Sequence, residues 1–206
     1  MKGFPFIIDI ENKRFLIVGG GRTAKRKLGT LRKFGALVTV VAAETDIAEE
    51  DGLTVIRKAF EAADLAGADY VIAATGSAQT DVAVAEVCKA HGVPVNTAGD
   101  AAQGDFYLPA TIKDGPLIVA VSTSGTSPAY ARRLREQIES QIPHGIGEIL
   151  ERLGSLRGEL MQRIPTQEKR QAAYEEILGW LLADHNKTDN EVIRQIIGHY
   201  ETEADE

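Results

Sequence analysis

A strand, a glycine-rich turn and a helix follow one another between residues 14 and 34, and this unit constrains the fold most. Residues 14–19 (RFLIVG) form a short, nearly continuous apolar run, as a strand buried in a parallel sheet requires. Residues 19–24 (GGGRTA) fit the pattern G-x-G-x-x-G/A, and residues 23–34 have the apolar spacing of a helix. The unit predicts a dinucleotide-binding turn, and the alternative is a turn shaped only by packing.

The small residues of this turn have distinct expected roles. Gly19 permits the tight turn, Gly21 lets the backbone approach a pyrophosphate, and Ala24 allows the helix to pack closely on the strand. The start of the helix offers free N–H groups and the positive end of the helix dipole. We therefore expect the cofactor to contact Gly19, Gly20, Gly21, Arg22 and Thr23.

The acidic residue that usually ends the second strand of such a unit is missing. Residues 40–43 read VVAA, and the nearest acid is Glu44. We expect the backbone of Ala43 and Glu44 to hold the adenosine ribose. Since no arginine follows that would favour a 2′-phosphate, we predict NAD rather than NADP. Thr75, directly after a later strand, is expected beside the nicotinamide or its ribose.

Strand and helix signals alternate through the first half of the chain. After the glycine turn, further strands are expected at 37–41, 53–56, 70–74 and 93–96, and a helix at 78–90. The alternation predicts an α/β fold with a doubly wound, Rossmann-type parallel sheet, whose ligand lies at the carboxyl ends of the strands. Beyond it we expect strands at 106–112 and 116–122, and helices at 128–141, 146–163, 167–183 and 189–200.

Composition argues against several classes of function. The net charge of -7 opposes sequence-independent binding to nucleic acid. A single cysteine, Cys88, allows no intramolecular disulfide and no cysteine-based metal cluster. No apolar run approaches the roughly 20 residues of a membrane helix, and the short apolar stretch near the N-terminus is unlike a secretory signal. We expect a cytoplasmic protein without a metal site or a membrane partner.

Three segments carry a resemblance to a known family. They are FPFIIDIENKRFLIVGGGRTAKRK, YVIAATGSAQTD and, the most specific, VPVNTAGDAAQGDFYLPATIKDGPLIVAVSTSGTSPAYARRLRE. From about Phe4 to about Gly147 the chain resembles the precorrin-2 dehydrogenase family, which includes the dehydrogenase/ferrochelatase part of siroheme synthase. Beyond about residue 150 it is similar to that family only in being helical.

The resemblance implies a homodimeric, NAD-dependent enzyme that oxidises precorrin-2 to sirohydrochlorin and passes a hydride to NAD. Some family members also insert iron to give siroheme. The resemblance divides the chain into a Rossmann domain over residues 1–112, a dimerisation and substrate-binding segment over 113–145, and a helical region over 146–206.

A hydroxyl-rich loop, residues 122–128 (STSGTSP), precedes the first helix of the second half. Ser127 suits the N-cap position and Pro128 the first helical position, so the loop ends at an anion-attracting helix start. Precorrin-2 carries eight carboxylates, which hydroxyls and helix arginines would bind. The alternative is a well-capped helix with solvated arginines. The expected substrate contacts are Asn96, Asp105, Thr123, Ser124, Ser127 and Arg132.

Hydride loss from the substrate must be accompanied by proton loss, so a base near the cofactor is expected. Family members that both oxidise and chelate usually have an aspartate three residues after the asparagine of the fifth strand. Here that position is Gly99, and Asp100 follows it. We expect Asp100 and His144 to be catalytic; the alternatives are residues of two ordinary turns. The departure at Gly99 predicts weak or absent ferrochelatase activity.

Two other functions stay open. The chain could be a ferrochelatase that keeps the NAD fold without using it, or an NAD-sensing regulatory domain. Sensor domains usually hold the ribose acid that this chain lacks, and they have no need of the STSGTSP loop. Formation of NADH distinguishes the dehydrogenase from both.

Overall fold

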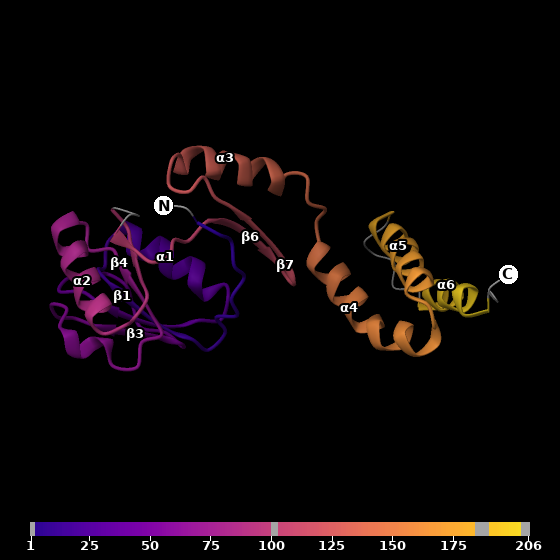
Figure 1. The fold of residues 1–206 in the computed structure, drawn as a ribbon, viewed down its shortest axis with the longest axis horizontal. Helices are drawn as coiled ribbons and strands as arrows, with labels where there is room; N and C mark the ends of the chain where they lie inside the picture. The colour runs from indigo at the N-terminus through magenta and orange to yellow at the C-terminus, as the bar shows by residue number, and fades with distance from the viewer. Residues whose placement is uncertain (1–2, 100–102, 184–189, 203–206) are drawn as a thin grey trace. The chain divides into compact units, whose positions relative to one another are not determined.

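The computed structural model describes residues 3–99, 103–183 and 190–202 (Figure 1). The chain divides into two compact units. The first comprises Met1–Pro109 with Ser122–Pro128, and the second comprises Ala110–Val121 with Ala129–Glu206. The three-part division expected from the sequence stays a prediction.

A parallel sheet of five strands forms the centre of the first unit. Its strands lie in the order β3-β2-β1-β4-β5, which places β1 in the middle. The strands are β1 (Arg14–Val18), β2 (Leu37–Val41), β3 (Leu53–Ile56), β4 (Tyr70–Ala73) and β5 (Val95–Thr97). The chain reverses direction of winding between β3 and β4, so a crevice is expected at the carboxyl ends of β1 and β4.

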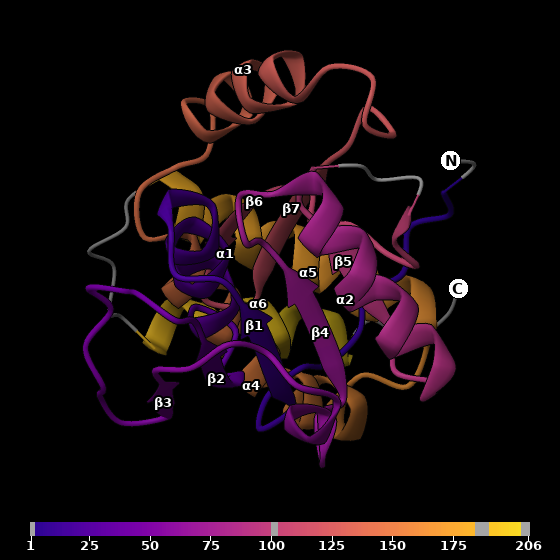
Figure 2. The same ribbon diagram turned by 90° about the vertical axis from the view of Figure 1, so that its left-hand side faces the viewer.

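Helices α1 (Arg22–Arg32) and α2 (Ala78–Ala90) flank this sheet (Figure 2). Neighbouring residues of a strand point to opposite faces, so each face of the sheet has its own core. Phe15 and Ile17 of β1 pack in the core that includes Leu28 of α1. Leu16 of β1 packs in the core that includes Val84 of α2. The predicted Rossmann-type fold is confirmed.

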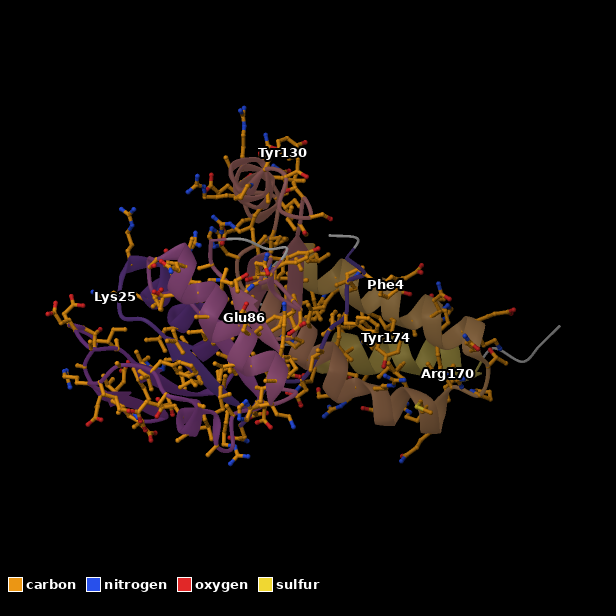
Figure 3. The ribbon with its side chains drawn as sticks, turned by 60° about the vertical axis from the view of Figure 1, so that its left-hand side comes forward. Phe4, Lys25, Glu86, Tyr130, Arg170 and Tyr174 are labelled. Carbon is orange, nitrogen blue, oxygen red and sulfur yellow. The ribbon has the colours of Figure 1, made fainter. Side chains whose placement is uncertain are left out.

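The second unit contains a hairpin and a group of helices. Strands β6 (Ala110–Asp114) and β7 (Leu117–Val121) pair antiparallel. The helices are α3 (Pro128–Glu139), α4 (Ile146–Arg163), α5 (Gln167–Ala183) and α6 (Asn190–Thr202). Leucine and isoleucine side chains of α4, α5 and α6 form one core, against which Tyr174 of α5 packs. Arg170 of α5 donates to the Ile164 and Pro165 carbonyl oxygens at the end of α4 (Figure 3).

Most elements lie where the sequence predicts them, and β6 is the main exception. It was expected at 106–112 but is found at Ala110–Asp114. The preceding segment is held by side-chain packing instead: the Phe106 ring meets Tyr70 edge-on at 5.7 Å, and Leu108 packs on the same core. A short 3-10 helix, η1 (Ala62–Leu65), was not predicted.

Candidate functional site

The glycine turn between β1 and α1 is packed tightly on both sides. Gly19 has φ +116°, and its N–H donates to the Val41 carbonyl oxygen at 2.8 Å. A Cβ at Gly19 would lie 2.2 Å from the Ala74 carbonyl oxygen, and a Cβ at Gly20 would lie 2.4 Å from the Thr45 Cβ. Since neither neighbour is the end of a flexible side chain, both positions require glycine.

Gly21 differs from its neighbours because a Cβ there would meet nothing within 4 Å. It is the N-cap of α1, and no side chain caps this helix or places an acid in its first turn. The first N–H groups of α1 therefore have no side-chain acceptor, and the space next to them at Gly21 is open. This combination fits the pyrophosphate of a dinucleotide, with Arg22 exposed next to it.

The residues that follow β2 form one wall of the turn. Ala43 and Glu44 are exposed, and Thr45 Oγ1 donates to the Gly20 carbonyl oxygen at 3.2 Å. The Asp46 carboxylate is bound by Lys25, whose Nζ lies 2.6 Å from Oδ2; this hydrogen bond is the main reason that the pKa of Asp46 is lowered. Backbone groups at Ala43 and Glu44 thus remain the candidates for the ribose, as the sequence suggests.

Thr75 lies at the end of β4, where a buried carboxylate holds it. Oδ1 of Asp81 accepts from the Thr75 N–H at 2.8 Å and from Thr75 Oγ1 at 2.7 Å. Asp81 is only 3% exposed. The Thr75 hydroxyl also accepts from the Ser77 N–H at 3.2 Å. The hydroxyl is therefore used inside the β4–α2 turn, and the backbone here packs against Gly19.

Asn96 of β5 is 2% exposed and joins two segments. Its Nδ2 donates to the Phe106 carbonyl oxygen at 2.7 Å, and its Oδ1 accepts from Lys27 Nζ at 2.5 Å. Asp105 closes the same loop, since its Oδ2 accepts from the Val95 N–H at 2.9 Å. The two predicted substrate contacts on this side thus hold the base of the loop after β5.

Lys27 is half-buried and carries a perturbed ammonium. The pKa of Lys27 is lowered from 10.5 to about 8, mainly by burial. The charge of the neighbouring Arg26 contributes to this lowering, whereas the charge of Asp81 opposes it. The charges of Lys27, which binds Asn96, and of Asp81, which binds Thr75, therefore act on each other.

The loop at Ser122–Pro128 is shaped by its own hydroxyls. Thr123 Oγ1 accepts from the Ser127 N–H and Ser122 Oγ from the Ser124 N–H, both at 3.0 Å. Ser124 has φ +53°, a left-handed conformation that is uncommon for a serine. Helix α3 begins at Pro128 as predicted.

The remaining predicted residues lie in the second unit or outside the described residues. Arg132 is exposed on α3, and His144 is exposed in the turn before α4, both in the second unit. Asp100 lies outside the described residues. The catalytic roles of Asp100 and His144 stay predictions.

Sequence reasoning missed two residues of the site, Lys27 and Asp81. Lys27 lies three residues after Ala24 and four before Leu31, so it shares the buried face of α1. A lysine on an apolar helix face was the available signal. Asp81 lies in the first turn of α2, where an acid is ordinary, and only the fold brings it to Thr75.

The first unit also has a cavity away from the glycine turn. A cavity of about 630 Å³ is lined by residues of β2 and β3, by Arg14 of β1 and by Gly67 in the segment before β4. It does not include the glycine turn. Among the described residues there is no cluster of three acidic, histidine or cysteine side chains suited to a metal ion. In that same part of the chain no helix has the length and apolarity to cross a bilayer.

Comparisons with known proteins show which families this chain is similar to. A family model described as putative NAD(P)-binding matches residues 6–110, a little over half of the chain. A second model, described as sirohaem biosynthesis protein central, matches residues 114–141. The first match and the dehydrogenase neighbour below confirm the prediction of an NAD-type cofactor.

Two curated relatives are siroheme synthases. That of Methylococcus capsulatus is 39% identical over 183 residues, which are 86% of this chain and 39% of the relative. That of Acinetobacter baylyi is 35% identical over 196 residues, 92% of this chain and 43% of the relative. The chain thus spans about two fifths of the length of these relatives.

A solved structure matches over the whole chain. SirC, precorrin-2 dehydrogenase, is 26% identical with a TM-score of 0.64, and the match covers 98% of this chain and 100% of that one. The two family models and this structural match agree with the resemblance seen in the sequence. The chain therefore belongs to the family of NAD(P)-binding proteins that includes precorrin-2 dehydrogenase and the corresponding part of siroheme synthase.

Proposed function

We propose that this protein is an NAD-dependent precorrin-2 dehydrogenase, which oxidises precorrin-2 to sirohydrochlorin in siroheme biosynthesis. The observation that carries the proposal is the structural likeness to SirC, precorrin-2 dehydrogenase, which extends over nearly the whole of both chains. The glycine turn, with open space at Gly21 and no cap on α1, supplies a matching cofactor site.

When bound, NAD accepts the hydride that leaves the substrate. The residues of this chain hold it in place: the turn Gly19–Gly20–Gly21 and the first N–H groups of α1 bind the pyrophosphate, with Arg22 and Thr23 beside them. Ala43 and Glu44 contact the ribose. Asp81 fixes Thr75, against which Gly19 packs, and so keeps the turn in shape.

On the substrate side, the proposed contacts are the residues that the resemblance indicates: Asn96, Asp105, Thr123, Ser124, Ser127 and Arg132. Asn96, which is 2% exposed, and Asp105 are hydrogen-bonded to backbone groups, so they support the proposed site by holding the loop after β5 in place. Asp100 is the proposed acceptor of the proton that leaves with the hydride, and His144 the proposed second proton-transfer residue.

The assay that tests this function uses precorrin-2 generated anaerobically. The protein and NAD are added, and the absorbance of NADH and the tetrapyrrole spectrum are followed together. The proposal predicts NADH in equal amount to sirohydrochlorin. Ferrous ion is then added to the same cuvette; because Gly99 replaces the usual aspartate, iron insertion is expected to be slow or absent.

We further propose that the protein is a cytoplasmic homodimer. The segment before β1 carries Phe4 (labelled in Figure 3), Phe6 and Ile7, which are 77, 78 and 83% exposed. Neighbouring exposed side chains of this size are typical of an interaction surface. A second copy of the chain is the expected partner, as the resemblance implies.

A further inference from the structure

Two charged side chains of the first unit, Lys27 and Asp81, lie near the carboxyl ends of the central strands without forming an ion pair. Asp81 is 3% exposed and acts on the Lys27 ammonium only through its charge. Among the described residues, the hydrogen-bond partner of Lys27 Nζ is the Asn96 side-chain oxygen at 2.5 Å, a neutral group. Burial of a charge is costly unless the charge is paired, so packing alone does not explain a lysine here.

The ammonium is oriented. Asn96 is itself fixed, because its Nδ2 donates to the Phe106 carbonyl oxygen at 2.7 Å. The Asn96 side-chain oxygen on β5 therefore holds Lys27 Nζ in a fixed position. An ammonium has three N–H donors, and this hydrogen bond uses one of them. A cation held in place with donors to spare, and only half-buried, is suited to binding an anion that arrives from solution.

The surroundings also favour an anion. Helix α1 has no acid in its first turn, and Arg22 and Arg26 lie on its exposed side. Lys25 on the same helix is different, because Asp46 neutralises it at 2.6 Å. Lys27 is thus a cation near the cofactor turn that no carboxylate of the described residues neutralises.

Its position assigns it to the substrate half of the site. In a doubly wound sheet the adenosine ribose lies at the end of the second strand, here β2. Lys27 instead reaches β5, two strands from β1 on the opposite side. The reactive half of a dinucleotide extends toward this side, and the substrate must approach it there.

We propose that Lys27, oriented by Asn96, is a substrate-binding residue whose ligand is a carboxylate of the tetrapyrrole. The inference rests on the proposed function, since precorrin-2 and sirohydrochlorin supply the carboxylates. The charge of Asp81 favours the ammonium form, but Asp81 does not occupy the ammonium's donors. The bound carboxylate completes the ion pair that the protein leaves open.

The test measures binding rather than turnover, with sirohydrochlorin as the probe. Dissociation constants for sirohydrochlorin and, separately, for NADH are measured by fluorescence on wild type, Lys27→Met, Lys27→Arg and Lys33→Met. Lys33 is an exposed lysine at the end of the same helix and serves as the matched control. Lys27→Met is expected to weaken sirohydrochlorin roughly 10- to 100-fold, the loss of a charged hydrogen bond, and to leave NADH binding unchanged.

The conservative variant and the control complete the comparison. Lys27→Arg keeps the charge and is expected to bind within a few-fold of wild type, as is Lys33→Met. If Lys27→Met does not fold, Lys27→Gln, which keeps a donor for Asn96 but removes the charge, decides the question. Unchanged sirohydrochlorin binding in the variant that folds, or equal weakening of NADH binding, would overturn the proposal.

Failure of the proposed function gives a different result. A wild-type protein that forms no NADH from precorrin-2, yet binds sirohydrochlorin through Lys27, refutes the dehydrogenase and keeps the carboxylate site. If wild type forms NADH from precorrin-2 while Lys27→Met binds sirohydrochlorin as tightly as wild type, the dehydrogenase is kept and the carboxylate site is refuted.

Discussion

At the scale of single residues, Lys27 is expected to lower stability in exchange for a binding role. Its pKa falls from 10.5 in the unfolded chain to about 8 in the folded protein, mainly through burial. Below pH 8 both states are charged, and the folded state carries the full cost of burying the ammonium. As the pH rises from about 8 toward 10.5 the folded state loses this proton first, so the cost disappears.

Lys27→Met is therefore expected to raise the free energy of unfolding at pH 7, by about 1–3 kcal/mol. The gain over wild type should shrink as the pH approaches 10. Urea unfolding of both proteins at pH 7 and at pH 10 measures it. A variant that is less stable than wild type at pH 7 would show that the Asn96 contact outweighs the burial cost.

Asp81 is a residue whose hydrogen bonds, rather than its charge, are expected to matter for the turn. Asp81→Ala removes the acceptor of the Thr75 N–H and the shorter of the two hydrogen bonds that the Thr75 hydroxyl donates, at a cost of about 1–3 kcal/mol. Asp81→Asn keeps an oxygen at the same position and is expected to lose less. Thermal unfolding and the NADH dissociation constant are measured on both. Equal losses in the two variants would assign the effect to the charge instead.

The glycines of the turn could be predicted from the sequence, whereas Lys27 and Asp81 could not. Gly19 and Gly21 have roles fixed by backbone geometry within a few residues, which a short motif records. Lys27 meets Asn96, 69 residues away, only after β5 has joined the sheet. Contacts of this kind depend on tertiary structure and have no local pattern.

At the scale of elements, the turn between β1 and α1 contains one glycine that packing requires, Gly19, and one that ligand binding is expected to require, Gly21. A Cβ at Gly19 would collide with the Ala74 carbonyl oxygen at 2.2 Å, whereas a Cβ at Gly21 would enter open space. Gly19→Ala is expected to lower the melting temperature by several degrees. Gly21→Ala is expected to leave it unchanged and to weaken NADH binding at least about tenfold, because the methyl group occupies the pyrophosphate position.

These two variants are compared by thermal unfolding and by NADH titration. A loss of stability in Gly19→Ala, together with a loss of NADH affinity in Gly21→Ala, would assign the pyrophosphate site to Gly21. If Gly21→Ala binds NADH as tightly as wild type, the open space at Gly21 is not the pyrophosphate site.

Elements with a strong local pattern were predicted well. The bounds expected for β2, β3, α2, α4 and α5 are the observed ones. The segment from Phe106 to Pro109 has the composition of a strand, but the aromatic contact with Tyr70 and the Asn96 hydrogen bond hold it as an irregular segment. Tertiary packing overrides strand propensity there.

At the scale of the whole molecule, the two units have separate cores. In the second unit a close approach joins the β6–β7 hairpin to α4: a Cβ at Gly115 would lie 2.8 Å from the Gly147 Cα. Gly115 also has φ +51°, so glycine is required at the hairpin turn on two grounds. The alternation of strands and helices predicted the first unit, whereas nothing in the sequence indicated this glycine contact.

The proposed homodimer is tested by sedimentation equilibrium. Wild type is expected at twice the mass of the 22.2 kDa chain. Phe6→Ser combined with Ile7→Ser, which replaces two exposed apolar side chains, is expected to shift the protein toward monomer without lowering its helix content. A monomeric wild type would remove the dimer from the account, and a dimeric variant would place its interface elsewhere.

The most direct test of the function is single-turnover oxidation of precorrin-2 in the absence of oxygen. Wild-type protein in excess of precorrin-2 is mixed with NAD, and NADH and sirohydrochlorin are quantified in the same sample. We expect one NADH for each sirohydrochlorin in wild type, and a large loss of both in Gly21→Ala. Conversion without NADH, or NAD binding without conversion, would refute the assignment as an NAD-dependent dehydrogenase.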